Sequence, residues 1–174
     1  MPSIPADKKD AWSDYPPLLA QLLYNRDALV DPQSFLDAGA SLCHDPFSLP
    51  DMHRAVERIN LAIDRGQKIV IYGDFDSDGV TSTVLLVQGL GSLGAHVFPY
   101  IPHRVEEGYG LNYDALDRLI DDGADLVITA DCGVTAIDEV EHANNKGLDI
   151  VITDHHTVPD VLPAAVAVVD AKRN

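Results

Sequence analysis

The hydrophobic pattern of the chain changes near Gly66. Before this point apolar residues recur at the three- and four-residue spacing of helices, with prolines at two of the expected helix starts. Residues 38–50 are rich in Gly, Ser, Asp and Pro and are typical of a connector. The pattern predicts three helices ahead of the glycine, at Leu18–Tyr24, Asp31–Leu36 and Asp51–Arg65.

After Gly66 short Ile/Val-rich runs alternate with helical segments that end at glycines. Strands are predicted at Lys68–Tyr72, His96–Ile101, Leu126–Thr129, Ile150–Thr153 and Ala164–Val169. Helices are predicted between them at Val80–Leu93, Asn112–Asp122 and Ala136–Lys146. This alternation indicates βαβ units. We therefore expect an α/β fold, with a parallel five-stranded Rossmann-like sheet, helices on both faces and a helical N-terminal arm.

Acidic residues and histidines follow three of the predicted strands, at Asp74, Asp76, Asp78, Asp131, Asp154, His155 and His156. Ligands of open parallel sheets bind beyond the carboxyl ends of the strands, so these groups would share one crevice. Five carboxylates would repel one another there unless divalent cations neutralised them, and oxygen-rich ligands suit Mg²⁺ or Mn²⁺. Taken singly, each segment is equally typical of a turn or a helix cap.

A phosphate group has candidate binding residues near the same edge. The helix expected from Val80 offers backbone N–H groups, and Thr81 and Ser82 add hydroxyls. Helix capping is an equally good explanation for these two hydroxyls.

The loop after the second strand adds further candidates. Arg104 is a candidate phosphate clamp, or it pairs with Glu106 or Glu107. Tyr109 either stacks on a base or sugar or anchors the loop between its two glycines. Cys132 has no cysteine partner at metal-site spacing, so we expect it to be a small packing residue.

Composition narrows the class of protein. The chain has 174 residues, 46% of them hydrophobic, and a formal net charge of −16. That length fits one domain, or one domain with an arm, and the charge argues against a simple basic nucleic-acid-binding module. Two cysteines are too few for a disulfide framework, and neither a membrane span nor an apolar signal segment is visible. We expect a soluble, cytoplasmic protein.

Three segments together resemble motifs I, II and III of the DHH phosphoesterase superfamily. They are Tyr72–Ser82, Thr129–Gly133 and Thr153–His156. Within that superfamily, Ile101–Leu111 and the N-terminal helices resemble the RecJ family of single-strand-specific 5′-to-3′ DNA exonucleases. The resemblance extends from about Tyr15 to the end of the chain.

The resemblance implies two-metal hydrolysis with Mn²⁺ or Mg²⁺ and assigns roles by position. Asp76 and Asp78 would each bind one ion, Asp131 would bridge both ions, and His155 would bind one. His156 would contact the scissile phosphate or help the leaving oxygen. Asp74 would be a ligand or would orient one, and Asp154 would act in catalysis, hold a neighbouring histidine or cap the turn.

The resemblance also implies a division of the chain. Residues 1–50 would form the helical arm and connector, and residues 51–174 a catalytic subdomain that ends before the family's fourth motif. The chain would then be the N-terminal half of a longer enzyme of DNA repair and recombination. Single-stranded DNA would be its substrate, and a single-strand-binding protein and a repair helicase are candidate partners, with no membrane involved.

Three other functions remain open from the sequence. One is a DHH phosphodiesterase of short oligonucleotides or cyclic dinucleotides, although such relatives generally lack the N-terminal arm. Another is a non-catalytic scaffold that binds metal or protein. The third is an aspartyl-phosphate phosphotransferase using Asp74 or Asp76, which would leave the Asp154–His156 segment without a role.

Overall fold

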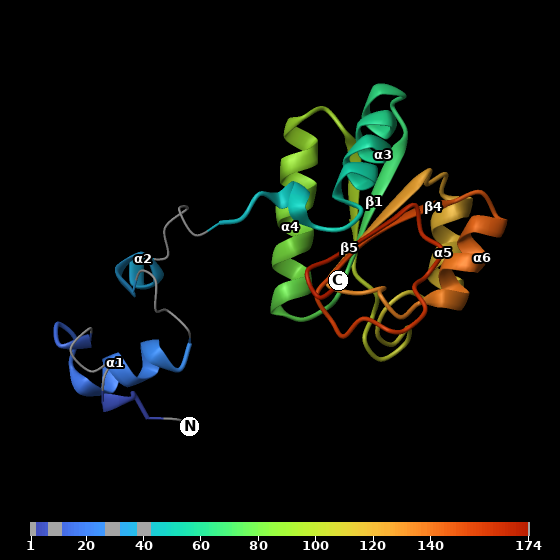
Figure 1. Ribbon diagram of the computed structural model, residues 1–174. Coiled ribbons are helices and arrows are strands. Elements are labelled where there is room, and N and C mark those ends of the chain that lie inside the picture. The colour runs from blue at the N-terminus through green and yellow to red at the C-terminus, as the bar shows by residue number, and fades with distance from the viewer. Residues whose placement is uncertain (1–2, 7–11, 27–31, 38–42, 174) are drawn as a thin grey trace. The chain divides into compact units, whose positions relative to one another are not determined.

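The computed structural model describes residues 3–6, 12–26, 32–37 and 43–173 (Figure 1). The chain separates into two compact units, Met1–Asp45 and Pro46–Asn174. Among the described residues, no helix combines the length and hydrophobicity required to cross a membrane.

The first unit contains two short helices, α1 (Pro17–Tyr24) and α2 (Pro32–Asp37). Both begin with proline, whose fixed φ suits the first helical position and whose missing N–H costs nothing there. Trp12, Ala20 and Leu23 form a small buried cluster against α1. Asp31, the expected cap of α2, lies outside the described residues.

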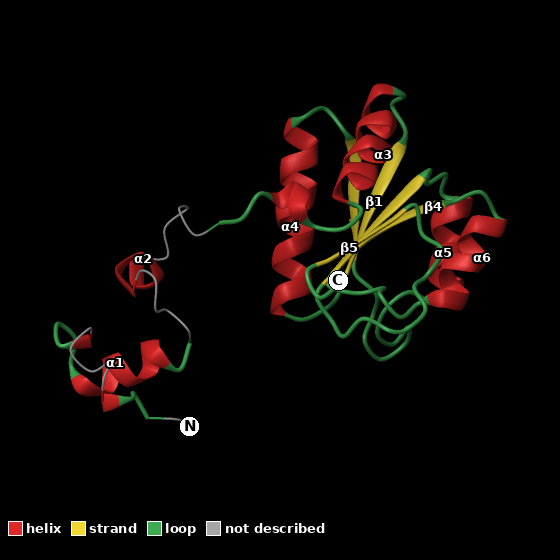
Figure 2. Cartoon of the chain, in the orientation of Figure 1, coloured by secondary structure: helices red, strands yellow, loops and turns green. Residues whose placement is uncertain are grey.

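The second unit is the predicted α/β sheet (Figure 2). Its five strands are all parallel, in the order β2-β1-β3-β4-β5. Its elements are η3 (Pro46–Ser48), α3 (Met52–Asp64), β1 (Lys68–Gly73), α4 (Ser77–Ser92), β2 (His96–Tyr100), α5 (Tyr113–Asp121), β3 (Leu126–Ala130), α6 (Ile137–Asn145), β4 (Asp149–Asp154) and β5 (Ala167–Asp170). The predicted fold class is therefore confirmed.

Helices cover the two faces of the sheet (Figure 1), and a hydrophobic core lies on each face. Because side chains alternate along a strand, Val70 and Tyr72 of β1 pack on the face covered by α5 and α6. Ile69 and Ile71 pack on the opposite face, against α3 and α4. Burial on both faces explains the continuous Ile/Val runs of the strands.

The start of α4 differs from the expectation from sequence. The helix begins at Ser77 rather than near Val80, because the Asp76 carboxylate caps it. One oxygen of Asp76 accepts hydrogen bonds from the N–H groups of Asp78 and Gly79, at 2.9 and 3.0 Å. Those two N–H groups are thus occupied by a side chain rather than open to a phosphate, and neither Thr81 nor Ser82 is the cap.

Asp51 ties the start of α3 to the end of β5. Its Oδ2 accepts hydrogen bonds from the Val168 N–H, at 3.2 Å, and from Arg173 Nη1, at 2.8 Å. Burial works to raise the pKa of Asp51, but these bonds outweigh it and hold the pKa below 3.8. A carboxylate with a depressed pKa adds stability above its unfolded-state pKa and loses that contribution as the pH falls.

We predict that Asp51→Asn lowers the free energy of unfolding by about 1 kcal/mol at pH 7. Asparagine tolerates the left-handed backbone at this position, where φ is 59°, so the variant removes mainly the charge. The deficit should shrink as the pH falls below about 4, because the carboxyl of the unfolded wild type then takes up a proton, and it should vanish once the folded-state carboxyl is protonated as well. Urea unfolding at pH 7 and pH 3 measures both values, and a deficit that does not change with pH would refute the electrostatic role.

Candidate metal centre

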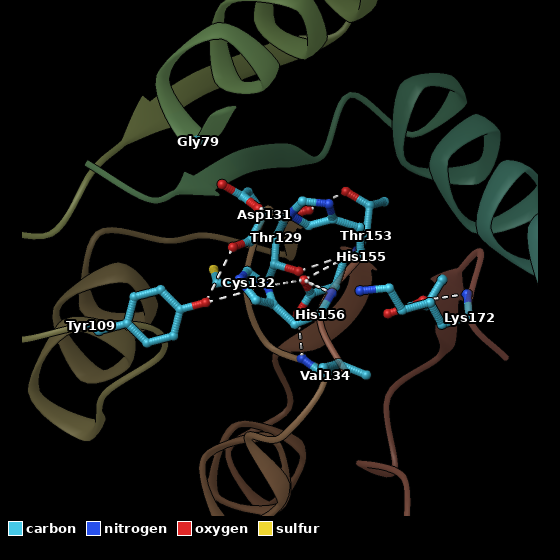
Figure 3. Close-up of polar contacts among 12 residues, drawn as sticks. Gly79, Tyr109, Thr129, Asp131, Cys132, Val134, Thr153, His155, His156 and Lys172 are labelled. Carbon is cyan, nitrogen blue, oxygen red and sulfur yellow. Dashed lines mark hydrogen bonds and ion pairs between the residues drawn. The ribbon is translucent and has the colours of Figure 1, made fainter. Parts of the chain in front are cut away.

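The candidate site lies at the carboxyl ends of β1, β3 and β4 (Figure 3). β1 is flanked by β2 and β3, and the chain leaves β1 for β2 before returning to β3. This reversal of strand order is the switch point at which open parallel sheets bind ligands. The predicted acidic residues after β1 and β3 therefore meet where the topology leaves a crevice.

The acidic residues after β1 adopt three different environments. Asp74 is buried, and its Oδ1 accepts a hydrogen bond from the Phe75 N–H at 2.7 Å. Asp76 is the exposed cap of α4, and Asp78 lies in the first turn of that helix. The turn is tight because Gly79 lies directly against the backbone of Asp74. This packing fixes the direction in which the three carboxylates leave the strand.

Asp131 occupies a left-handed turn immediately after β3, with φ of 67°. Aspartate tolerates this conformation better than most residues. Two threonines hold the turn against β4: the Thr153 hydroxyl donates to the Thr129 carbonyl at 2.5 Å, and the Thr153 N–H donates to the Thr129 hydroxyl at 3.2 Å. The Asp131 carboxylate is thereby placed, buried, beside the residues that follow β1 and β4.

The Asp154 carboxylate hydrogen-bonds the two histidines that follow it rather than facing solvent. Its Oδ2 accepts a hydrogen bond from the Val134 N–H, at 2.9 Å. Its Oδ1 accepts hydrogen bonds from the N–H groups of His155 and His156 and pairs with the Nδ1 of His156, the last at 2.7 Å. With its side chain only 1% exposed and both oxygens engaged, this carboxylate is suited to orienting an imidazole.

Two overlapping groups of potential ligand atoms share Asp131. One consists of Asp74, Asp76 and Asp131, the other of Asp131, His155 and His156, and in each group the atoms lie within 4.8 Å of one another. Carboxylate oxygens with an imidazole match the donor preferences of Mn²⁺ and Mg²⁺.

The Asp131 carboxylate fits a cation for a second reason. Its Oδ1 is buried, and its neighbour His155 Nε2, 2.8 Å away, pairs with it only when the imidazole is protonated at that nitrogen. With Nε2 unprotonated, the described residues offer this oxygen no hydrogen-bond donor. A buried carboxylate oxygen without a donor is costly, and a bound cation would remove that cost. The residues present therefore fit a divalent metal ion.

The electrostatics of the carboxylates also favour a cation. Burial and the nearby charge of Asp76 raise the pKa of Asp131, whereas the N–H groups of Gly79 and Asp78 lower the pKa of Asp76. The candidate ligand oxygens of the two carboxyl groups lie within 4.8 Å of each other. Such a pair holds two negative charges together most readily when a positive ion lies between them.

A cavity of about 370 Å³ opens beside the two groups. Asp78, Thr81 and Ser82 of α4 line it, together with Asp131 and His155. Asp78 thus faces the site without joining either ligand group in the part of the chain that the structure describes. The Thr81 hydroxyl donates to the Ser77 carbonyl at 2.7 Å, so only its acceptor side faces the cavity freely.

The loop after β2 contributes Arg104 and Tyr109. Arg104 forms none of the ion pairs found among the described residues, and its guanidinium lies over the Phe75 ring. The Tyr109 hydroxyl lies 3.4 Å from the Asp131 carbonyl and 3.5 Å from His156 Nδ1 (Figure 3). Tyr109 therefore reaches the site, while the residue is 55% exposed.

Cys132 is fully buried in the core, and its thiol lies 3.7 Å from the Tyr72 carbonyl. Burial raises its pKa, which keeps the thiol neutral and unsuited to metal binding. The expectation of a packing role is confirmed.

Thr129, Thr153 and Phe75 contribute to the site, but sequence reasoning missed them. A threonine precedes two of the three strand-end motifs, as Thr129-Ala130-Asp131 and Thr153-Asp154, and this repetition was the available signal. No such signal pointed to Phe75, because its partner Arg104 is distant in the sequence.

The fold and the clustered side chains define an α/β protein with a candidate divalent-metal centre at the switch point of its sheet. Residues 68–174 match the family model described as "DHH family, N-terminal domain". The chain therefore belongs to the DHH family.

Two curated relatives show which proteins of this family the chain is similar to. The chain is 42% identical over 159 residues to the single-stranded-DNA-specific exonuclease RecJ of Bacillus subtilis, covering 90% of this chain and 20% of the relative. It is 37% identical over 162 residues to the Escherichia coli protein of the same name, covering 92% of this chain and 28% of the relative. The chain thus spans well under a third of these two relatives.

Solved structures agree with the fold. One, described as exonuclease RecJ bound to manganese, superposes with a TM-score of 0.68 at 36% identity, covering 74% of this chain and 33% of the other. RecJ of Thermus thermophilus in complex with Mn²⁺ superposes with a TM-score of 0.72 at 27% identity, covering 98% of this chain and 24% of the other. The parallel sheet described above is therefore similar to that of RecJ structures.

Proposed function

We propose that this chain supplies the metal-binding part of a single-stranded-DNA-specific exonuclease that cleaves phosphodiester bonds with Mn²⁺ or Mg²⁺. The observation that carries the proposal is the pair of ligand groups joined at Asp131, at the switch point of the sheet. The relatives named RecJ and their manganese-bound structures support the choice of substrate and ion. On the same basis we propose 5′-to-3′ polarity and a role in DNA repair and recombination, in the cytoplasm.

Asp74, Asp76, Asp131 and His155 would hold the ions, with Asp131 shared between the two groups. Asp78 lies in the first turn of α4, on the cavity wall, and would complete the coordination of the second ion. When bound, the ions would supply charge neutralisation and activate a water for attack on phosphorus. The side chains position the phosphate and exclude competing ligands; none of them is required as a nucleophile.

His156 would act on the phosphate. The hydrogen bond from its Nδ1 to Asp154 raises its pKa and leaves its Nε2 free of that carboxylate. A protonated imidazole at this place suits a phosphate oxygen or the departing oxygen. Asp154 acts through His156, as a positioning residue. The guanidinium of Arg104 and the hydroxyl of Ser82 would contact phosphate groups of the strand, and Thr81 would join them by turning its hydroxyl from the Ser77 carbonyl to the phosphate.

The alternatives remain distinguishable by substrate. A phosphodiesterase of short oligonucleotides or cyclic dinucleotides would prefer those to long strands. A non-catalytic scaffold would bind Mn²⁺ or protein partners without hydrolysis. The aspartyl-phosphate reaction would leave the hydrogen-bonded turn of Asp154, His155 and His156 without a role, and it predicts a trapped phospho-enzyme.

We predict Mn²⁺-dependent release of nucleotides from 5′-labelled single-stranded DNA by this chain, with little release from duplex DNA. His156→Gln should lower the rate about 100-fold, the usual contribution of a positioned acid or base. The measurement is a time course of labelled product with and without EDTA.

His142→Gln is the matched control, because His142 pairs with Asp117 on the surface between α5 and α6. Its rate should equal that of the wild type. Equal rates for His156→Gln and the wild type, or preference for cyclic dinucleotides over long strands, would refute the assignment. Mn²⁺ binding without any hydrolysis would favour the scaffold.

A further inference from the structure

Phe75 lies between two of the candidate ligands, Asp74 and Asp76, yet its side chain belongs to neither ligand group. We propose that Phe75 is a positioning residue that holds the Arg104 guanidinium beside the metal centre for contact with a substrate phosphate. The inference rests on the proposed function, because it presumes a phosphate-bearing substrate. It adds a link between the acidic motif and the loop after β2.

The neighbours of Arg104 exclude the simplest alternative, an ion pair within its own loop. Glu107 is already engaged: it binds the Arg118 side chain, accepts the Tyr100 hydroxyl at 2.6 Å and accepts the His103 N–H at 2.6 Å. Glu106 appears in none of the ion pairs or side-chain hydrogen bonds of the described residues. The Arg104 charge is therefore not neutralised by either glutamate.

The contact that Arg104 does make is with the Phe75 ring. Its guanidinium carbon lies over that ring, 4.4 Å from the centroid, which is within the range of a cation–π interaction. A ring attracts the cation through its face and takes none of the guanidinium N–H groups. The five donors thus remain available for a phosphate, which Arg can bind through two parallel hydrogen bonds.

The position of Phe75 in the chain connects Arg104 to the candidate ligands. Its N–H donates to Asp74 Oδ1 at 2.7 Å, so the residue is fixed by a candidate ligand on one side and followed by the cap of α4 on the other. The loop carrying Arg104 has no strand or helix of its own to fix it. The half-buried Phe75 ring therefore restricts the position of the Arg104 side chain, which is exposed and would otherwise be flexible.

The first test measures binding of a 5′-phosphorylated oligothymidylate by fluorescence anisotropy in Mn²⁺. Arg104→Ala should weaken binding about 10-fold, the value of a lost charge-assisted hydrogen bond. Phe75→Leu should weaken it about 3- to 5-fold, and Phe75→Tyr should restore it, because the ring returns. In the Arg104→Ala background Phe75→Leu should have no further effect, whereas an equal loss in both backgrounds would overturn the inference.

Phe98→Leu is the matched control. Lys68 Nζ lies 5.3 Å from the Phe98 ring centroid, so this variant also removes a ring beneath a cation, but on β2 away from the candidate ligands. It should leave oligothymidylate binding unchanged. Mn²⁺ affinity, measured by calorimetry, should stay within about 2-fold of wild type in Phe75→Leu, since a lost cation–π contact does not remove a ligand.

A second measurement separates this inference from the proposed function. The Nε–H resonance of Arg104, identified by its loss in Arg104→Lys, should show an upfield ring-current shift that Phe75→Leu abolishes and Phe75→Tyr retains. That result without DNA binding would refute the proposed function but leave the contact standing. An Arg104 resonance that does not respond to Phe75→Leu would refute the contact itself.

Discussion

Asp131→Asn is expected to lower Mn²⁺ affinity by more than about 100-fold. Substituting a residue that only orients a metal ligand lowers metal affinity about 10- to 100-fold. Asp131 is itself a candidate ligand and belongs to both ligand groups, so its substitution should lower the affinity further. Asparagine is the informative substitution because it keeps the side-chain shape and tolerates the left-handed backbone, where φ is 67°. Alanine would add backbone strain to the loss of the ligand. Calorimetric titration with Mn²⁺ measures the change.

In the absence of metal ions, the Asp131→Asn variant should be at least as stable as the wild type. In the absence of a cation, the Asp131 carboxylate is buried beside Asp76, and burial with that charge raises its pKa. Removing the charge relieves the repulsion. Loss of metal binding without loss of stability is the signature of a residue placed for function rather than for folding.

Asp170→Asn provides the control for this experiment. Asp170 is also a buried acid at the carboxyl end of a strand, but it belongs to neither ligand group among the described residues. Its variant should bind Mn²⁺ as the wild type does. Unchanged Mn²⁺ affinity in Asp131→Asn, or an equal loss in both variants, would refute the shared role of Asp131.

The sheet was predictable because its signals are local. Ile/Val runs of strand length alternate with helices that end at glycine, and parallel strands then bring their carboxyl ends to one edge. Asp74, Asp131 and His155 could be placed together for that reason alone. The helix predicted over Asn112–Asp122 is present as α5, and Asn112 caps it: its side chain accepts the Ala115 N–H at 2.8 Å.

The remaining features depend on contacts between distant residues. Nothing local in the sequence distinguishes Asp76 as the cap of α4 from Asp78 in its first turn, so the helix start was misplaced by three residues. The engagement of Asp154 requires the N–H of Val134, twenty residues earlier. The sequence suggests the neighbouring glutamates as ion-pair partners of Arg104, but Glu107 binds Arg118 instead. The ring under Arg104 is that of Phe75, which lies on the loop after β1.

Gly79→Ala is expected to destabilise the second unit strongly, because the added methyl group has no room. A Cβ at this position would lie 2.5 Å from the Asp74 carbonyl oxygen and 2.6 Å from the Asp74 Cα. These are backbone atoms, which cannot rotate away as a side chain would, so β1 and α4 must separate. We expect a loss of about 3 kcal/mol in the free energy of unfolding, at the upper end of overpacking costs.

The same helix carries a matched control. Gly89 lies on α4 with no atom within 4 Å of an added Cβ, so Gly89→Ala should stabilise the protein by about 0.5–1 kcal/mol through helix propensity. Thermal unfolding should therefore shift in opposite directions for the two variants. In Gly79→Ala the displaced Asp74 carboxylate should also weaken Mn²⁺ binding, since Asp74 belongs to a ligand group. Wild-type stability and Mn²⁺ affinity in Gly79→Ala would show that the strand and the helix do not approach this closely in solution, and the placement of the three acidic residues would then need another cause.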